Sequence, residues 1–330
     1  MRAKPAELRP FRDDDLDAAG SLLAARHRRH RRDEPLLPER YEREEEARAA
    51  VERAWRKDGA AGVAAVNGRR VVGYLIGAAE DEGAWGQNEW IDVPGQAVEE
   101  PELLRDLYAA LAETAVGKGR SRHYLLAPAS DRELLDACYR VGFGQQQAYG
   151  IREVEHTAWP ERVREAALDD VEALLPLTLA ISQHHAGSPV FSDHAARRVE
   201  RVEETKDDVR AQLEADIASD EIATLVVEVD GRVAGFLEAC AVELAGEGVE
   251  GHATLARPDG AAFLAFAATA AAARGLGTGV DLTNAAFAWA HRAGYPTMVT
   301  AWRVPNLLAS RFWPRRGFRT TFLRLYRSIP

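Results

Sequence analysis

The sequence predicts an α+β protein made of two copies of one unit, each a mixed, mainly antiparallel sheet flanked by helices. Three observations predict it. Similar segments recur in the two halves, short apolar strands alternate with amphipathic helices, and a glycine-rich turn joins one late strand to a helix. At 330 residues the chain is long for one domain and natural for two.

Three pairs of segments carry the repeat. The first pair predicts a short strand followed by the start of an Asp-capped helix. The second pair predicts a hairpin with an Asn-Gly or Asp-Gly turn, and the third pair predicts a last strand that begins with Gly-Phe. The pairs are 8–16 with 163–171, 66–75 with 229–237, and Gly142-Phe143 with Gly317-Phe318. The boundary is expected near 153–162, which gives domains over 1–155 and 160–330.

Composition favours a reduced, cytoplasmic protein. No apolar run is long enough for a membrane span, and the N-terminus lacks the apolar core of a signal peptide. Cys138 and Cys240 form neither a disulfide framework nor a metal-binding pattern, so no metal is expected. Lys occurs only at positions 4, 57, 118 and 206, and this Arg-rich, Ala-rich composition is typical of a GC-rich bacterial genome such as an actinobacterial one.

The charge balance argues against a nucleic-acid partner. The net charge is −10, whereas nucleic-acid binders carry a basic excess. A basic run, 26–32, is followed at once by acidic residues, and we interpret it as a solvated helix face. An acidic protein is compatible with a cationic amine substrate.

The most informative stretch is Arg274-Gly-Leu-Gly-Thr-Gly279. It follows an apolar run, 263–269, that reads as a buried strand, and it precedes 280–293, where apolar residues recur at helical spacing. Such a turn aims unpaired backbone N–H groups at the positive end of the helix dipole, which suits a phosphate or pyrophosphate. Gly277 and Gly279 allow close backbone approach, and Arg274 can add a charge-assisted contact.

Two phosphate loops fit poorly, and a third fits well. The glycine spacing is not the Rossmann G-x-G-x-x-G, and no Lys-Ser or Lys-Thr follows as in a Walker A loop. Arg274-x-x-Gly277-x-Gly279 resembles the [QR]-x-x-G-x-[GA] loop of the GNAT N-acetyltransferase superfamily. Downstream, a strand at 297–301 precedes a segment that resembles the family's N-x-x-A-x-x-[FLY]-Y-x-x-x-G-F motif. The matching residues are Asn306, Ala309, Phe312, Gly317 and Phe318.

This resemblance implies acetyl-coenzyme A as acyl donor. In the family the loop holds the pyrophosphate, the preceding strand splays and offers main-chain groups to the pantetheine, and the Asn-led helix lies beside that arm. The implied cofactor-binding residues are Ala267, Ala268, Thr269, Arg274, Gly275, Leu276, Gly277, Thr278, Gly279, Asn306, Phe312 and Trp313. Trp313 departs from the pattern, because the family often has there a Tyr that acts as general acid.

The first half lacks the loop. By the repeat, 99–104 corresponds to the glycine loop, Asp131 to Asn306 and Cys138 to Trp313. Three carboxylates and no glycine cannot cradle a pyrophosphate, so the first half is expected to keep the fold without this site. A degenerate first half and an intact second half resemble the tandem GNAT proteins that include mycothiol synthase, in architecture alone.

Candidate catalytic groups are few. A general base could be Glu238, on the strand before the loop strand, or His252, in a loop rich in Gly and Glu. Tyr326 could replace the missing acid. His184-His185 lie in a helix-loop region that often lines an acceptor pocket in such folds, although a polar loop is the simpler interpretation.

Two functions follow. The first is an acetyl-CoA-dependent N-acetyltransferase that acts through the second half on an amine of a small molecule or peptide, without nucleic-acid or membrane partners. The second is a non-catalytic acyl-CoA-binding or sensor protein. Since the two halves could pack as a pseudo-dimer, we expect a monomer, or else a homodimer.

Overall fold

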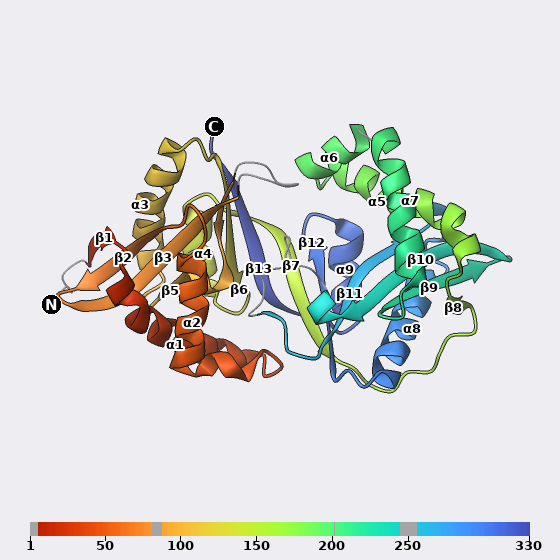
Figure 1. Ribbon diagram of the computed structural model, residues 1–330, viewed down its shortest axis with the longest axis horizontal. Helices are drawn as coiled ribbons and strands as arrows, with labels where there is room; N and C mark the ends of the chain where they lie inside the picture. The colour runs from red at the N-terminus through yellow and green to blue at the C-terminus, as the bar shows by residue number, and fades with distance from the viewer. Residues whose placement is uncertain (1–5, 81–87, 201, 245–255) are drawn as a thin grey trace. The chain divides into compact units, whose positions relative to one another are not determined.

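The computed structural model describes residues 6–80, 88–200, 202–244 and 256–330, which form two compact units (Figure 1). Unit 1 takes the described residues up to Ala148, together with Ala256, Arg257 and Thr320–Pro330. Unit 2 takes the described residues from Tyr149 to 244 and from 258 to Arg319. Each unit therefore contains a segment from the other half of the sequence.

Unit 1 holds the first set of strands and helices. Its strands are β1 (Glu7–Pro10), β2 (Ala61–Asn67), β3 (Arg70–Glu80), β4 (Asn88–Ile91), β5 (Gln96–Val98), β6 (Arg122–Pro128) and the first part of β7 (Gly144–Glu153), with β13 (Arg319–Ser328) from the chain's end. Its helices are α1 (Leu16–Asp33), α2 (Glu44–Trp55), α3 (Leu103–Gly117) and α4 (Arg132–Arg140). The strand order is β1-β2-β3-β4-β6-β13-β7, and β5 pairs with β3.

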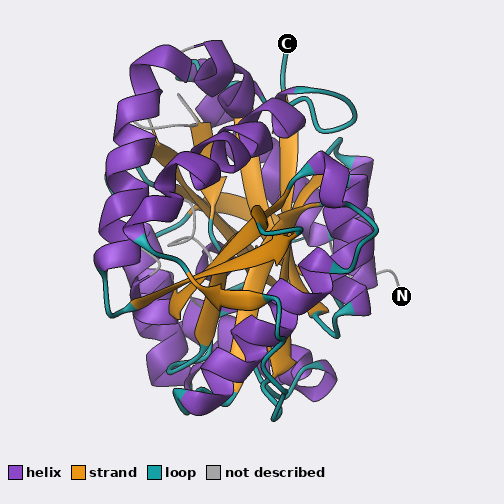
Figure 2. Cartoon of the chain, turned by 90° about the vertical axis from the view of Figure 1, so that its right-hand side faces the viewer, coloured by secondary structure: helices purple, strands orange, loops and turns teal. Residues whose placement is uncertain are grey.

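Unit 2 repeats the plan. Its strands are the last part of β7, β8 (Val163–Glu165), β9 (Ile222–Val229), β10 (Arg232–Ala241), β11 (Ala262–Thr269) and β12 (Thr297–Arg303). Its helices are α5 (Val171–Ala186), α6 (Asp193–Glu200), α7 (Val202–Ala218), α8 (Thr278–Arg292) and α9 (Leu307–Arg315). The strand order is β7-β12-β11-β10-β9-β8, with helices flanking the strands (Figure 2).

Both sheets are mixed, as the sequence predicts. In unit 1, β4 and β6 are parallel, and in unit 2, β11 and β12 are parallel. The hairpins β2–β3 and β9–β10 are antiparallel. Their turns place Gly68, Asp230 and Gly231 at φ of 65°, 52° and 71°, the left-handed region that Gly and Asp tolerate best. The Asn-Gly and Asp-Gly signals in the sequence therefore mark both turns correctly.

The start of each unit shows the repeat in atomic detail. Arg9 forms a two-fold ion pair with Asp15, at 2.7 Å for both contacts, and the Asp15 carboxylate also accepts from the backbone N–H of residue 12. Arg164 forms the same pair with Asp170, at 2.7 and 2.9 Å, and Asp170 accepts from the N–H of residue 167. Each carboxylate thus fixes the turn from a first strand into a first helix.

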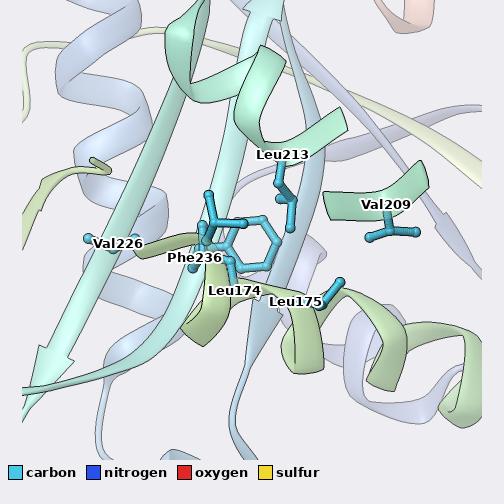
Figure 3. Packing of buried hydrophobic residues seen from close by; sticks show 7 residues of the cluster. Leu174, Leu175, Val209, Leu213, Val226 and Phe236 are labelled. Atoms are coloured by element: carbon cyan, nitrogen blue, oxygen red, sulfur yellow. The ribbon is translucent and has the colours of Figure 1, made fainter. Parts of the chain in front are cut away.

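The core of unit 2 lies between the sheet and the helices α5 and α7. Phe236 of β10 is fully buried, and its side chain and those of Leu174 and Leu213 point toward one another (Figure 3). Phe266 and Ala268 of β11 pack against this cluster. Since Phe236 pairs with Ala268 and Glu238 with Phe266, Glu238 shares this face of the sheet.

One interpretation of the sequence is wrong. The basic run in α1 is not a solvated face throughout, because Arg26, His27 and His30 are 3%, 1% and 4% exposed. Burial lowers the pKa of His27 to about 4 and that of His30 to about 3, so both rings are neutral. His27 donates to the Pro38 carbonyl at 2.7 Å, and His30 packs edge-on against Phe322. The run combines a buried stripe with a solvated one.

The two units do not coincide with the two halves of the sequence, because the last strand of each half lies partly or mostly in the other unit. β13, the last strand of the chain, pairs with β6 in unit 1 over seven residues, from Phe322 opposite Pro128 to Ser328 opposite Arg122. The end of β7 belongs to unit 2, where the Val154 N–H donates to the Pro296 carbonyl at 2.9 Å. The last strands are exchanged between the units. Among the described residues, no helix is long and apolar enough to cross a membrane.

Candidate functional site

In unit 2 the parallel strands β11 and β12 separate partway along their length. Among the described residues they pair only through 262–264 of β11 and 298–300 of β12, and the Thr300 hydroxyl donates to the Leu264 carbonyl at 3.0 Å. The other edge of β11 stays paired with β10 as far as Thr269. Along the described residues that follow Leu264, the edge of β11 that faces β12 has no recorded ladder pair, so its backbone groups, those of Ala267 to Thr269 included, are open to another partner.

The glycine loop lies where β11 ends and α8 begins. Gly277 is the N-cap of α8 with φ of 81°, and Gly275 has φ of 83°. The N–H groups of Val280 and Asp281 donate to the Gly277 carbonyl at 3.0 Å. Within the described structure, the N–H groups of Thr278 and Gly279 have no recorded backbone acceptor. Two donors at the positive end of a 15-residue helix form an anion-binding corner.

Three predicted elements meet at Gly279. A Cβ on Gly279 would lie 3.4 Å from Phe312 Cζ on α9 and 4.0 Å from Thr269 Cγ2 on β11. The loop, the end of β11 and α9 therefore come together as the motif spacing predicts. A side chain at this position would press on the ring of Phe312, so glycine keeps the helix start close to both neighbours.

An arginine that sequence reasoning missed braces the loop. Arg162, just before β8, forms a two-fold ion pair with Asp281 at 2.5 and 3.0 Å and donates to the Leu276 carbonyl at 3.2 Å. These contacts tie the loop and the first turn of α8 to the segment before β8. Arg274, the predicted phosphate contact, is exposed, and its backbone N–H donates to the Ala271 carbonyl at 3.3 Å. Its side chain is therefore accessible to a ligand at the loop.

Asn306 joins α9 to the end of α5. Its side-chain oxygen accepts from the N–H groups of Leu308 and Ala309, at 3.1 and 3.3 Å, which makes it the N-cap of α9. The same oxygen accepts from His184 Nε2 at 3.2 Å, and the Asn306 amide donates to His185 Nε2 at 3.3 Å. Asn306 thus fixes the tautomer of a neutral His185, with its proton on Nδ1.

Burial keeps His185 neutral. It lowers the pKa of His185 to about 4, and the nearby Arg303 and His184 lower it further. The sequence placed the two histidines near an acceptor pocket without a partner. The structure shows that they contact Asn306 where β12 leads into α9. This contact spans more than 120 positions, so no local pattern predicts it.

Glu238 has the electrostatics of a general base. Burial raises its pKa to about 7, and the charge of Asp216 on α7 adds to the rise. It lies opposite Phe266, next to a bulge between β10 and β11 where Ala239 pairs with Leu264. Within the described part of the chain, no hydrogen bond is recorded for its carboxyl group. Bulges of this kind often re-aim side chains next to functional sites.

The remaining candidates lie elsewhere. Trp313 is 8% exposed and packs edge-on against Phe312 and Phe318, at 5.0 and 5.7 Å between ring centroids, so it is part of the core beside the loop. Tyr326 belongs to unit 1, where it lies opposite Tyr124 with a 5.1 Å ring contact. The structure therefore does not group it with the glycine loop. His252 lies outside the described residues.

In unit 1 the corresponding helix start is closed. The N–H groups of residues 103, 104 and 105 donate to the carbonyls of residues 100, 101 and 102, at 3.0 to 3.1 Å. The carboxylate of Glu102 pairs with Arg105 and Arg140, and that of Glu99 with Arg70. Asp131 caps α4 as Asn306 caps α9, and burial raises the pKa of the Cys138 thiol to about 12.

Residues 190–318 match the model of the acetyltransferase (GNAT) family. The chain carries a GNAT acetyltransferase domain. The match covers β9, β10, β11, the glycine loop, α8, β12 and α9, and so includes the three elements that meet at Gly279. At the level of the family, this match supports an acyltransferase enzyme, and N-acetyl transfer is the chemistry of the family.

Solved structures show the same fold over the whole chain. A GCN5-related N-acetyltransferase from Sphaerobacter thermophilus is similar with a TM-score of 0.53 at 14% identity, covering 98% of this chain and 95% of the other. A glucosamine N-acetyltransferase region of a fungal multi-domain β-N-acetylglucosaminidase gives 0.52 at 14% identity, covering 98% of this chain and 38% of the other. The predicted α+β fold with GNAT-like units is confirmed.

A tandem GNAT protein from the clavulanic acid biosynthesis pathway is also similar, with a TM-score of 0.47 at 15% identity and 98% coverage of both chains. No curated protein matches the sequence significantly.

Proposed function

We propose that the GNAT domain of the second half binds acetyl-CoA and transfers its acetyl group directly to an amine of a small molecule or peptide. The observation that carries this proposal is the pair of N–H donors at Thr278 and Gly279, next to the strand β11 that has separated from β12. The donors suit the pyrophosphate, and the open edge of β11 suits the pantetheine amides. Acetyl-CoA is the usual acyl donor of the family.

The transfer needs a neutral amine at the thioester carbon. A C–N bond forms, the tetrahedral intermediate collapses, and the C–S bond breaks to release the CoA thiolate, with much of the rate supplied by positioning. Glu238 takes the ammonium proton, because a carboxyl group with a pKa of about 7 can both accept and release a proton near neutral pH. A backbone N–H on the open edge of β11 stabilises the oxyanion.

We place His184 and His185 on the acceptor side, in contact with Asn306, the residue that the motif assigns to the pantetheine arm. Their hydrogen bonds give fixed donors and acceptors where β12 leads into α9. A partly buried set of fixed polar groups favours an acceptor that itself carries hydrogen-bonding groups over a purely apolar amine.

One observation favours the alternative of a non-catalytic acyl-CoA-binding protein. The position of the usual acid is held by Trp313, whose indole is packed against Phe312 and Phe318 and cannot supply a proton to the thiolate. In that case binding would occur without turnover.

Calorimetric titration of the full chain with acetyl-CoA tests the proposal. We expect one site per chain, and release of free thiol when a panel of amines is added. A stoichiometry near two would mean that unit 1 also binds. Absence of binding would overturn the proposal, and binding without thiol release across the panel would leave the non-catalytic alternative.

A further inference from the structure

Unit 2 holds a second candidate site, which the glycine loop does not use. It is an open cavity of about 430 Å³ beside the middle of α8 and the end of α9. Ten residues line it, and four of them are arginines. The lining residues are Arg152, Glu153, Glu155, Thr157, Asn284, Phe287, Arg315, Arg316, Gly317 and Arg319.

Two of the arginines are held in place by the protein. Arg152 lies over the ring of Phe287, with its guanidinium carbon 4.0 Å from the ring centroid, and it donates to the Arg316 carbonyl at 2.5 Å. Arg319 forms a two-fold ion pair with Glu153, at 2.8 and 3.1 Å. These contacts fix the cationic walls of the cavity before any ligand enters.

The other two arginines offer donors to a ligand. Arg316 Nε is buried, and within the described residues it has no hydrogen-bond partner. Arg315 is exposed, and no ion pair is recorded for it in the described part of unit 2. A buried donor without an acceptor is costly, so an acceptor that enters the cavity gains the corresponding free energy.

The charges in the cavity favour an anion. Its four arginines outnumber its two carboxylates, and one of those, Glu153, is already paired with Arg319. Burial lowers the pKa of Arg152. The carboxylates of Glu155 and Glu153 offset part of this, and the charges of Arg316 and Arg319 lower the pKa again, so like charges lie close together here. A dianion with several oxygens relieves this crowding, and guanidinium groups match phosphate oxygens in geometry.

The cavity adjoins the loop through a single aromatic ring. The guanidinium carbon of Arg316 is 5.9 Å from the centroid of Phe312, and Phe312 lies 3.4 Å from the Cβ position of Gly279. Coenzyme A carries, besides its pyrophosphate, a phosphate monoester on its ribose. A ligand whose pyrophosphate sits at Thr278 and Gly279 can therefore bring a second phosphate to the far side of Phe312.

We propose that the cavity at Arg152, Arg315 and Arg316 binds a phosphate monoester, and that the 3′-phosphate of coenzyme A is its occupant. This assignment of the occupant rests on the proposed function. The cavity then makes the protein selective for acetyl-CoA over a donor that lacks this phosphate, independently of the pyrophosphate contacts.

Calorimetry with paired ligands tests the proposal. Wild-type protein is titrated with acetyl-CoA and with 3′-dephospho-acetyl-CoA, and we expect acetyl-CoA to bind about 10- to 100-fold more tightly, as for one or two charge-assisted hydrogen bonds. Arg315→Glu, an exposed position, should abolish this preference while the affinity for the dephospho ligand stays within about two-fold. Arg311→Glu, on the same helix but outside the cavity, is the matched control and should retain the preference.

Each other outcome has a defined meaning. Equal affinity of the wild type for both ligands overturns the assignment to the 3′-phosphate. Titration with inorganic phosphate and adenosine 3′,5′-bisphosphate then shows whether the cavity binds a free phosphate compound instead. If either probe binds to the wild type and Arg315→Glu abolishes that binding, the cavity is a phosphate site whose ligand is not coenzyme A. Absence of binding for both of these probes as well overturns the site altogether. If neither form of acetyl-CoA binds but the bisphosphate does, the proposed function fails and the cavity stands.

Discussion

The starts of α3 and α8 occupy the same place in the repeat and differ in what satisfies their backbone. At α8, Gly277 turns the chain at positive φ, and the N–H groups of Thr278 and Gly279 are left for a ligand. At α3, a tight turn pairs each of the first three N–H groups with a carbonyl of the same turn. The difference lies in a few residues at the helix start, because the strand–helix arrangement is otherwise shared.

The edge of the strand that leads into this helix differs between the two units in the same way. In unit 1 the buried guanidinium of Arg26 donates to the carbonyls of Val93 and Gln96, and the Gln96 amide donates to the Leu126 carbonyl on β6 at 3.2 Å. In unit 2 the corresponding edge of β11 has no recorded partner along its described length beyond Leu264. One unit satisfies its open strand with its own side chains, and the other leaves it for a ligand.

The largest effect is expected for Gly277→Glu, which should close the open helix start of unit 2. The side chain adds a carboxylate at the anion site and a Cβ at φ of 81°, so we expect acetyl-CoA affinity to fall at least about 1,000-fold. Gly231→Glu, in the β9–β10 turn at φ of 71°, imposes similar strain away from the loop and should bind normally. Calorimetry on both variants checks this, and retained affinity in Gly277→Glu would show that the loop is not the binding site. Glu102→Ala should not create a site in unit 1.

The second test concerns catalysis in unit 2, where the helix start is open. Glu238→Gln should lower kcat/KM about 100-fold, as expected for loss of a general base, with acetyl-CoA affinity unchanged. The wild-type rate should rise as the pH increases through about 7, because only the ionised carboxylate accepts a proton, and Glu238→Gln should lose this step. A pH–rate profile of both proteins measures it, and an unchanged step in the variant would assign the base to another group.

The third test concerns unit 1, where the helix start is closed. Arg26→Met removes the donor to two buried carbonyls while filling similar volume, so we expect the free energy of unfolding to fall by about 2 kcal/mol. Denaturant titration measures the loss. Acetyl-CoA stoichiometry should remain one per chain, since the N–H groups at the start of α3 stay internally bonded. A second binding site in Arg26→Met would mean that Arg26 alone occludes unit 1.

The smallest effect compares the two helix caps. Asn306→Ala and Asp131→Ala each remove an N-cap, and each should cost about 1 kcal/mol of stability. Asn306→Asp keeps the cap but loses the amide that donates to His185, so it should raise the KM for the amine at near-normal stability. Thermal unfolding and steady-state kinetics separate the two effects. A normal KM in Asn306→Asp would remove the histidines from the acceptor site.

The local features of this molecule could be predicted from the sequence, and the long-range ones could not. Glycine spacing marks the loop, and the Asn-led motif marks α9, because cap and turn residues act within a few positions. Arg162 is 119 residues from Asp281, and Arg26 is 67 from Val93, so no local pattern links them. The buried stripe in α1 was missed because a run of seven basic and His residues conceals which of them face the core.

The exchange of the last strands has a consequence for how the protein is made. Unit 1 contains the first 148 residues, yet its strand β6 gains its partner β13 only from the last eleven residues of the chain. During synthesis the unit whose residues emerge first from the ribosome is therefore completed after unit 2, and the edge of β6 that pairs with β13 stays unpaired until residues 322–328 have been made. Although the two halves of the sequence look like a simple duplication, neither half alone contains all the strands of one unit.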